Sequence, residues 1–206
     1  MLYRILRPIV RFLLNLLARI EYVGLENFPS PPYILVTNHL AVFDIPLLMV
    51  ACPHPVHPLV ADKHKRNPFY AALVSIARPV WVKRGEVDRR ALRGSLAVLE
   101  RGGVLGIAPE GTRARGVYAL QKGKAGTAYL AARADALIVP VGLSGSEQIK
   151  RCLPRLRRAR VRVAVGRPFR LPESGRIRGE KLEEYTDLIM RRLAELLPEE
   201  YRGVYG

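Results

Sequence analysis

YILVTNHLAVFD, the stretch from Tyr33 to Asp44, is the clearest structural signal in the chain. Its first four residues are apolar, which predicts a short buried strand. Asp44 and Pro46 then predict the start of a helix that continues through Val50, because a capping aspartate and an early proline both favour a first helical turn. A buried strand that leads directly into a helix is typical of an α/β protein.

The rest of the chain alternates short apolar segments with helical patterns. Further strands are predicted at 59–60, 80–82, 104–107, 137–141 and 161–165, and further helices at 67–77, 88–100, 125–133 and 181–197. The sequence contains no internal repeat and no low-complexity tract. We therefore expect an α/β fold in which residues 21–206 form a single domain, with a central mixed sheet flanked by helices.

The N-terminal segment 1–20 has a basic helical pattern of its own. Its polar residues recur every three or four positions, at Arg4, Arg7, Arg11, Asn15 and Arg19. On a helix they form one stripe within an arc of about 120°, opposite a broad apolar surface. The apolar runs are too short to span a bilayer, so we expect a helix that lies on the cytoplasmic face of the cell membrane as a peripheral or monotopic anchor. Packing of the apolar surface on the domain's own core is the alternative.

The charge balance predicts anionic partners. The chain of 206 residues carries 34 Lys and Arg against 18 Asp and Glu, a formal net charge of +16. Such an excess attracts nucleic acid, acidic lipid headgroups, phosphorylated substrates or an acidic carrier protein. Seven cations fall within 150–162, but no aromatic residues are interleaved with them, so nucleic acid is not an expected partner. Two interpretations of this basic segment remain. It is either a solvated basic face or a surface for anionic lipid, coenzyme A or a carrier protein.

Metal-based chemistry is not expected. His54, His57 and His64 lie near Asp62, but the prolines among them forbid the regular helix that a short histidine spacing would need to form a zinc site. The two cysteines are a hundred residues apart and form no CxxC pair. The Lys122-Gly123-Lys124 segment fails the phosphate-loop pattern of nucleotide-binding proteins, although its lysines remain candidates for an anion site.

His39 and Asp44 form the first candidate for catalysis. The histidine follows a predicted strand, and the carboxylate comes five residues later at a predicted helix start. Such a loop can fold back so that Asp44 accepts a hydrogen bond from one imidazole nitrogen, which leaves the other to take a proton from a substrate hydroxyl. The spacing alone is common, and a surface histidine beside a capping aspartate is the alternative interpretation.

Two further segments add phosphate-binding chemistry. PEGTR (109–113) follows the predicted strand 104–107, and WVKRG (81–85) ends another strand. Glycine permits close backbone approach, while Thr112 and Arg113 are donors suited to a phosphate. Because strand ends on one side of an α/β sheet face the same crevice, these segments can converge with His39 on one pocket.

Together these blocks resemble the glycerolipid acyltransferase family, and most closely its short bacterial lysophosphatidic acid acyltransferases. The resemblance rests on four blocks that occur in the family's order: His39 with Asp44, the segment that ends in Arg84-Gly85, the PEGTR block and Val139-Pro140-Val141. The resemblance implies transfer of an acyl chain from acyl-CoA or acyl carrier protein to the sn-2 hydroxyl of lysophosphatidic acid. The product is phosphatidic acid, a step of phospholipid biosynthesis that needs no metal and no covalent acyl-enzyme.

The resemblance also assigns roles to residues. His39 is the general base and Asp44 orients it. The implied phosphate contacts are Arg84, Glu110, Gly111, Thr112, Arg113 and, near the substrate, Lys63; the implied lining of the acyl site is Val139, Pro140, Val141 and Trp81. Three positions depart from the family pattern: Ala108 stands where an aromatic is usual, Trp81 where phenylalanine is usual, and Arg78 where a small residue is usual.

Two alternatives stay open. The same chemistry could serve another acceptor, such as glycerol-3-phosphate, a lyso-aminolipid or a glycolipid, because a hydroxyl nucleophile needs the same base in each case. A non-enzymatic basic protein that binds lipid or nucleic acid is the alternative from another class. The pair His39 and Asp44 distinguishes an enzyme from a binding protein, because a binding protein has no need of a carboxylate-oriented histidine.

Overall fold

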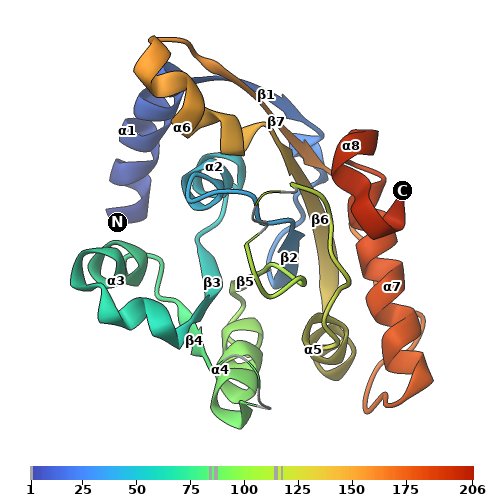
Figure 1. The fold of residues 1–206 in the computed structure, drawn as a ribbon. Helices are drawn as coiled ribbons and strands as arrows, with labels where there is room; N and C mark the ends of the chain where they lie inside the picture. Colours follow the sequence, from blue (N-terminus) through green and yellow to red (C-terminus); the bar gives the residue numbers. More distant parts are fainter. Residues whose placement is uncertain (1, 84, 86–87, 114–115, 117) are drawn as a thin grey trace.

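The computed structural model describes residues 2–83, 85, 88–113, 116 and 118–206, and Figure 1 shows a central sheet with helices on both faces. The strands are β1 (Ala18–Val23), β2 (Tyr33–Thr37), β3 (Val56–Ala61), β4 (Val80–Val82), β5 (Val104–Ile107), β6 (Leu137–Ser144) and β7 (Ala159–Val165). Their order in the sheet is β1-β7-β6-β2-β5-β3-β4. Neighbouring strands are parallel except β6 and β7, so the predicted mixed α/β sheet is confirmed.

The helices pack as two layers, one on each face. They are α1 (Leu2–Leu17), α2 (Asp44–Ala51), α3 (Pro68–Ser75), α4 (Arg89–Glu100), α5 (Gly126–Ala134), α6 (Ile149–Cys152), α7 (Glu180–Ala194) and α8 (Glu199–Arg202). Residues of α4, α5, α7 and α8 share one apolar core with one face of the sheet, and residues of α1, α2 and α6 share a second core with the other face.

Strand β2 lies at the centre of this arrangement. Its residues Tyr33, Ile34, Leu35 and Val36 are all fully buried. Ile34 and Val36 pack in the first core, while Tyr33 and Leu35 pack in the second. A strand covered on both faces must be apolar at every position, which is why a continuous apolar run predicts it correctly.

The N-terminal helix ends at Leu17, before the end of the segment 1–20 predicted to be helical. Ala18, Ile20 and Tyr22 instead turn their side chains to the second core, alternating with Arg19 and Glu21, and this period-two pattern forms the edge strand β1. The strand pairs in parallel with β7, in the register Ala18 to Ala159. Arg19 fits the basic stripe of the helix as well as the alternation of the strand, which is why the sequence pattern placed the boundary too late.

Helix α1 divides its apolar surface between the protein and solvent. Leu14 is buried, and Val10 and Leu17 pack beside it on the second core. Arg7 faces inward as well, where Nη2 and Nε donate to the Val50 carbonyl near the end of α2 at 2.8 and 3.2 Å. The outward stripe is apolar and 51% to 64% exposed: Ile5, Ile9, Phe12, Leu13 and Leu16. Part of the broad apolar surface therefore packs on the core, and part remains exposed.

Candidate active site

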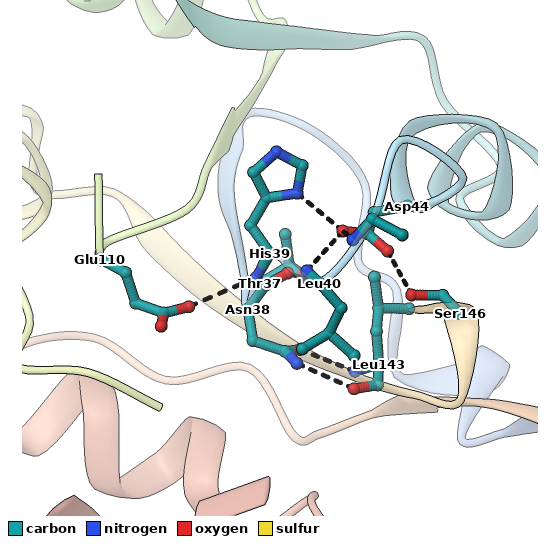
Figure 2. Close-up of polar contacts among 9 residues, drawn as sticks. Thr37, Asn38, His39, Leu40, Asp44, Glu110, Leu143 and Ser146 are labelled. Carbon is teal, nitrogen blue, oxygen red and sulfur yellow. Dashed lines mark hydrogen bonds and ion pairs between the residues drawn. The ribbon is translucent and has the colours of Figure 1, made fainter. Parts of the chain in front are cut away.

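His39 and Asp44 meet as the sequence predicts. His39 follows β2, and its Nδ1 lies 2.7 Å from Asp44 Oδ2 at the first residue of α2 (Figure 2). The same oxygen accepts the backbone N–H groups of Leu40 at 2.7 Å and Ala41 at 2.9 Å, so the loop wraps around a buried carboxylate. Because an ionised carboxylate only accepts hydrogen bonds, Nδ1 carries the ring hydrogen and Nε2 of the neutral ring is left as a base.

Ser146 completes this pair from a distant part of the chain. It begins the 3-10 turn η3 (Ser146–Gln148), is fully buried, and donates from Oγ to Asp44 Oδ1 at 2.6 Å. Gly145 makes the turn possible, because its φ is +81° and a Cβ there would lie 2.0 Å from the Arg160 carbonyl oxygen. Sequence reasoning missed Ser146 because it ended the strand at Val141, whereas β6 continues to Ser144 and brings the turn to the His39 loop.

Asn38 fixes the start of the loop that runs from His39 to Asp44. Its Nδ2 donates to the Leu143 carbonyl and its Oδ1 accepts the Leu143 N–H, both at 2.8 Å. The amide side chain thus continues the parallel pairing of β2 with β6 beyond the last backbone register pair, Thr37 and Val141. Since Asn38 is buried, both of its polar atoms are satisfied in the way that buried amides require.

Glu110 supports the loop from the opposite side. Its Oε1 accepts the His39 N–H at 3.3 Å and its Oε2 accepts the Gln121 N–H at 3.1 Å. Burial raises the pKa of the Glu110 carboxyl, and the two backbone N–H groups partly offset this effect. The resemblance implied a phosphate contact for Glu110, but both oxygens of this buried side chain are engaged with the backbone, and a carboxylate is not a donor.

Gly111 and Lys124 lie together next to Glu110. Gly111 has a φ of +69°, and a Cβ there would lie 2.9 to 3.1 Å from Cδ, Cε and Nζ of Lys124. The Lys124 N–H also donates to the Pro109 carbonyl at 2.9 Å. The glycine therefore allows the lysine side chain to cross the turn, which brings a cation to the residue block that the resemblance assigned to phosphate.

The other predicted phosphate contacts are more scattered. Arg113 keeps its Nε buried with no hydrogen-bond partner among the described residues, and Thr112 is exposed. Lys63 is exposed on the 3-10 turn η2 (Asp62–Arg66). Arg84 lies outside the described residues.

A cavity of about 1370 Å³ opens beside His39 and Asp44. Gly111 and Lys124 also line it, as does Ala108 where an aromatic residue is usual in the family. Much of the remaining wall is apolar and comes from α1, α2 and α4, with Tyr3, Leu6, Val10, Leu48, Met49, Leu92 and Leu96 among the lining residues. The cavity thus joins the imidazole to an extended apolar surface.

The residues predicted to line the acyl site lie elsewhere. Val139, Pro140 and Val141 belong to the central strand β6, where Val139 and Val141 are fully buried in the second core. Trp81 in β4 has Lys65 Nζ 5.0 Å from its ring centroid. None of these four is among the described residues that line the cavity. Val139 and Val141 are instead held within the second core.

The predicted loop histidines are used in local contacts. His57 Nδ1 lies 3.1 Å from the Arg78 carbonyl, and His54 Nδ1 lies 3.3 Å from the Tyr33 hydroxyl. Within the part of the chain that the structure describes, no three His, Cys, Asp or Glu residues come together in a way that could hold a metal ion.

Fold and site together define an α/β protein in which a carboxylate-oriented histidine lies beside an apolar cavity. The chain belongs to the acyltransferase family, because the family model described as Acyltransferase matches residues 19–144, from β1 to the end of β6. The resemblance drawn from the motif blocks is thereby confirmed.

Relatives and a solved structure agree with this assignment. An uncharacterized protein of Mycobacterium leprae is 32% identical over 155 residues, which are 70% of this chain and 41% of that protein, so the match spans less than half of its length. The 1-acyl-sn-glycerol-3-phosphate acyltransferase of Bacillus subtilis is 20% identical over 198 residues, 95% of this chain and 96% of that enzyme. The 1-acyl-sn-glycerophosphate acyltransferase of Thermotoga maritima shares the fold, with a TM-score of 0.72 at 21% identity over 94% of this chain and 79% of that one.

Proposed function

We propose that this protein transfers an acyl chain from acyl-CoA or acyl carrier protein to the sn-2 hydroxyl of lysophosphatidic acid, giving phosphatidic acid. The observation that carries the proposal is the His39 to Asp44 contact of 2.7 Å beside a cavity of about 1370 Å³. The cavity exceeds the roughly 300–1,000 Å³ of ordinary ligand pockets, which suits a site that takes a lipid and a thioester together. The relatives named as 1-acylglycerol-phosphate acyltransferases support this acceptor.

The reaction proceeds in one displacement. His39 Nε2 takes the proton of the acceptor hydroxyl as its oxygen attacks the thioester carbonyl carbon. The buried carboxylate of Asp44 stabilises the imidazolium that forms. When the tetrahedral intermediate collapses, the carbon–sulfur bond breaks and the imidazolium returns the proton to the leaving thiolate. Atoms and charge balance without a covalent enzyme intermediate.

The acceptor phosphate binds at the turn of Gly111 and Lys124. Lys124 lines the cavity beside the catalytic loop and supplies a cation there. Arg113, whose Nε has no described partner, is the second donor, and Arg84, Thr112 and Lys63 complete the set that the family resemblance implies. Glu110 is a positioning residue in this proposal, because its carboxylate holds the backbone of His39.

The acyl chains occupy the apolar part of the cavity. Tyr3, Leu6 and Val10 on the inner side of α1 line it, whereas Ile9 and Phe12 on the same helix face solvent. No helix among the described residues is long and apolar enough to cross a bilayer. We assign the exposed stripe of α1 to the surface of an anionic membrane at the cytoplasmic face, so that one helix contacts both the bilayer and the substrate cavity.

The proposed reaction is tested by thiol release from acyl-CoA in detergent, with lysophosphatidic acid, glycerol-3-phosphate and a phosphate-free lysolipid as acceptors. Release with lysophosphatidic acid alone, lost in His39→Ala, is the expected result. Release only with the phosphate-free lysolipid would overturn the assignment of lysophosphatidic acid as the acceptor and would leave the assignment of His39 as the base standing. If none of the three acceptors supports thiol release, the same series is repeated with an acyl carrier protein thioester as donor. Absence of release in that series as well would overturn the proposed reaction.

The membrane role is tested with point variants of the stripe, since deletion of residues 1–20 would remove half of the edge strand β1. The triple variant Ile9→Ser, Phe12→Ser and Leu16→Ser should sediment with anionic vesicles much less than the wild type, because it removes exposed apolar area without touching the core. Unchanged sedimentation of a folded variant would overturn the assignment of α1 to the membrane.

A further inference from the structure

The turn between α6 and β7, residues 153–158, exposes two leucines. Leu153 is 52% exposed and Leu156 is 96% exposed, the highest value among the large apolar side chains that the structure describes as exposed. Leu156 therefore contributes almost nothing to the hydrophobic stabilisation of the domain, because it buries almost no area.

The backbone at Leu156 is unfavourable for a leucine. Its φ and ψ are +50° and +32°, in the left-handed region that a residue with a Cβ rarely adopts. Glycine would occupy this position with less strain. Neither packing nor backbone conformation of the isolated protein therefore accounts for the side chain at the tip of the turn.

The same turn is strongly basic. Lys150, Arg151, Arg155, Arg157, Arg158, Arg160 and Arg162 are all exposed, and no acidic residue interrupts the segment. The side chains of Arg155 and Arg157, which flank Leu156, make no hydrogen bond or ion pair with any residue that the structure describes. An apolar tip between uncompensated cations is complementary to a lipid surface, which offers an apolar interior beneath a layer of anionic phosphates.

The turn lies beside the end of α1. Cys152 packs on the core that contains Leu14 and Ala18, and Arg158 Nη2 donates to the Ala18 carbonyl at 2.9 Å. Figure 1 shows α6 next to the C-terminal end of α1, where the chain enters β1. The exposed leucines and the apolar stripe of α1 therefore belong to neighbouring parts of the molecule.

We propose that the 153–158 turn is a second membrane contact, in which Leu153 and Leu156 insert at the headgroup level while Arg155 and Arg157 contact lipid phosphates. The inference rests on the proposed action at a lipid surface. A single weak apolar anchor gives only marginal, reversible membrane binding, whereas an apolar contact combined with a basic patch holds more firmly. An acidic carrier protein would use the arginines but would leave Leu156 without a role.

The test compares binding of the full chain to vesicles of phosphatidylglycerol with phosphatidylcholine and to vesicles of phosphatidylcholine alone. Arg155→Gln with Arg157→Gln should weaken binding to the anionic vesicles about fivefold per arginine and leave the zwitterionic vesicles unaffected. Leu153→Ser with Leu156→Ser should weaken binding to both on the order of tenfold.

Matched controls lie at other exposed positions. Arg167→Gln removes one exposed cation beyond the far end of β7, roughly 20 Å along the strand from the turn, and Val204→Ser removes an exposed apolar side chain near α8. Both should bind vesicles like the wild type. Leu156→Gly keeps the test independent of folding, because it should raise thermal stability by relieving the left-handed backbone and still weaken vesicle binding.

Two outcomes would overturn the proposal. Vesicle binding of the turn variants equal to that of the controls would show that the turn does not touch lipid. Unchanged vesicle binding together with loss of transfer from acyl carrier protein would assign the arginines to the carrier protein instead. The vesicle assay needs no substrate, and the transfer assay in detergent needs no vesicle, so failure of this inference and failure of the proposed reaction are separately visible.

Discussion

Ser146→Ala should slow the chemical step and leave acceptor binding intact. The substitution removes one hydroxyl from a fully buried residue, and Asp44 Oδ1 loses the donor that lies 2.6 Å away. Asp44 Oδ2 keeps its contacts to His39, Leu40 and Ala41, so the loop should still form. The carboxylate, held at one oxygen only, gains freedom to rotate away from the imidazole.

The magnitude follows from the type of hydrogen bond that is lost. A hydrogen bond to a charged group contributes about 1.5–3 kcal/mol, so the free energy of unfolding should fall by about 2 kcal/mol. If about 1.4 kcal/mol of this is realised as lost orientation of His39, kcat falls about tenfold. The acceptor KM should not change, because Ser146 is not among the described residues that line the cavity.

The assay combines thiol-release kinetics with denaturant unfolding, and Ser95→Ala is the matched control for stability. Ser95 is as buried as Ser146, but its Oγ has no hydrogen-bond partner among the described residues, so its loss should not lower the free energy of unfolding. An unchanged kcat with reduced stability would show that Ser146 acts on folding alone. A raised KM with unchanged kcat would place Ser146 in contact with substrate and refute the positioning role.

Three other predictions use the same assays. His39→Ala should lower kcat at least about 100-fold, because it removes the base. Asp44→Asn should act mainly on kcat and little on KM, because it removes the carboxylate that sets the tautomer of His39. Lys124→Ala should raise the KM for lysophosphatidic acid about tenfold or more, while Lys122→Ala, which is not among the described cavity-lining residues, should leave it unchanged; equal effects would refute the phosphate site. Burial raises the pKa of the Tyr201 hydroxyl to about 12, so the neutral form stabilises the fold below pH 10 and this contribution is lost as the pH rises towards 12. The difference in unfolding free energy between wild type and Tyr201→Phe should therefore shrink between about pH 10 and 12, and a difference that stays constant there would contradict the assignment.

The parts of the site that the sequence could predict are local in the chain. His39 and Asp44 are five residues apart, and a short loop between a strand and a helix can bring them into contact without reference to the rest of the fold. The burial of β2 could also be predicted from the sequence, because a strand covered on both faces has a continuous apolar run. Local patterns therefore sufficed to predict the contact between His39 and Asp44.

The parts that could not be predicted depend on strand order. Ser146 is 102 residues from Asp44, and Glu110 is 71 residues from His39. Both contacts arise because β2 lies between β6 and β5 in the sheet, and no spacing in the sequence specifies that neighbourhood. The same limit affected the acyl-site prediction, because Val139 and Val141 lie on the strand beside β2 but pack in the second core.

Strand order also explains how the loop that carries His39 is held from two sides. From the β6 side, Asn38 pairs with Leu143 and Ser146 holds Asp44; from the β5 side, Glu110 holds the backbone of His39. The contacts of Asn38 and Ser146 are buried and that of Glu110 is partly buried, so release of the loop would leave unpaired polar groups in or near the core. Because contacts from both flanking strands hold the loop, the imidazole is already oriented in the free protein, and we expect substrate binding energy to remain available for the transition state.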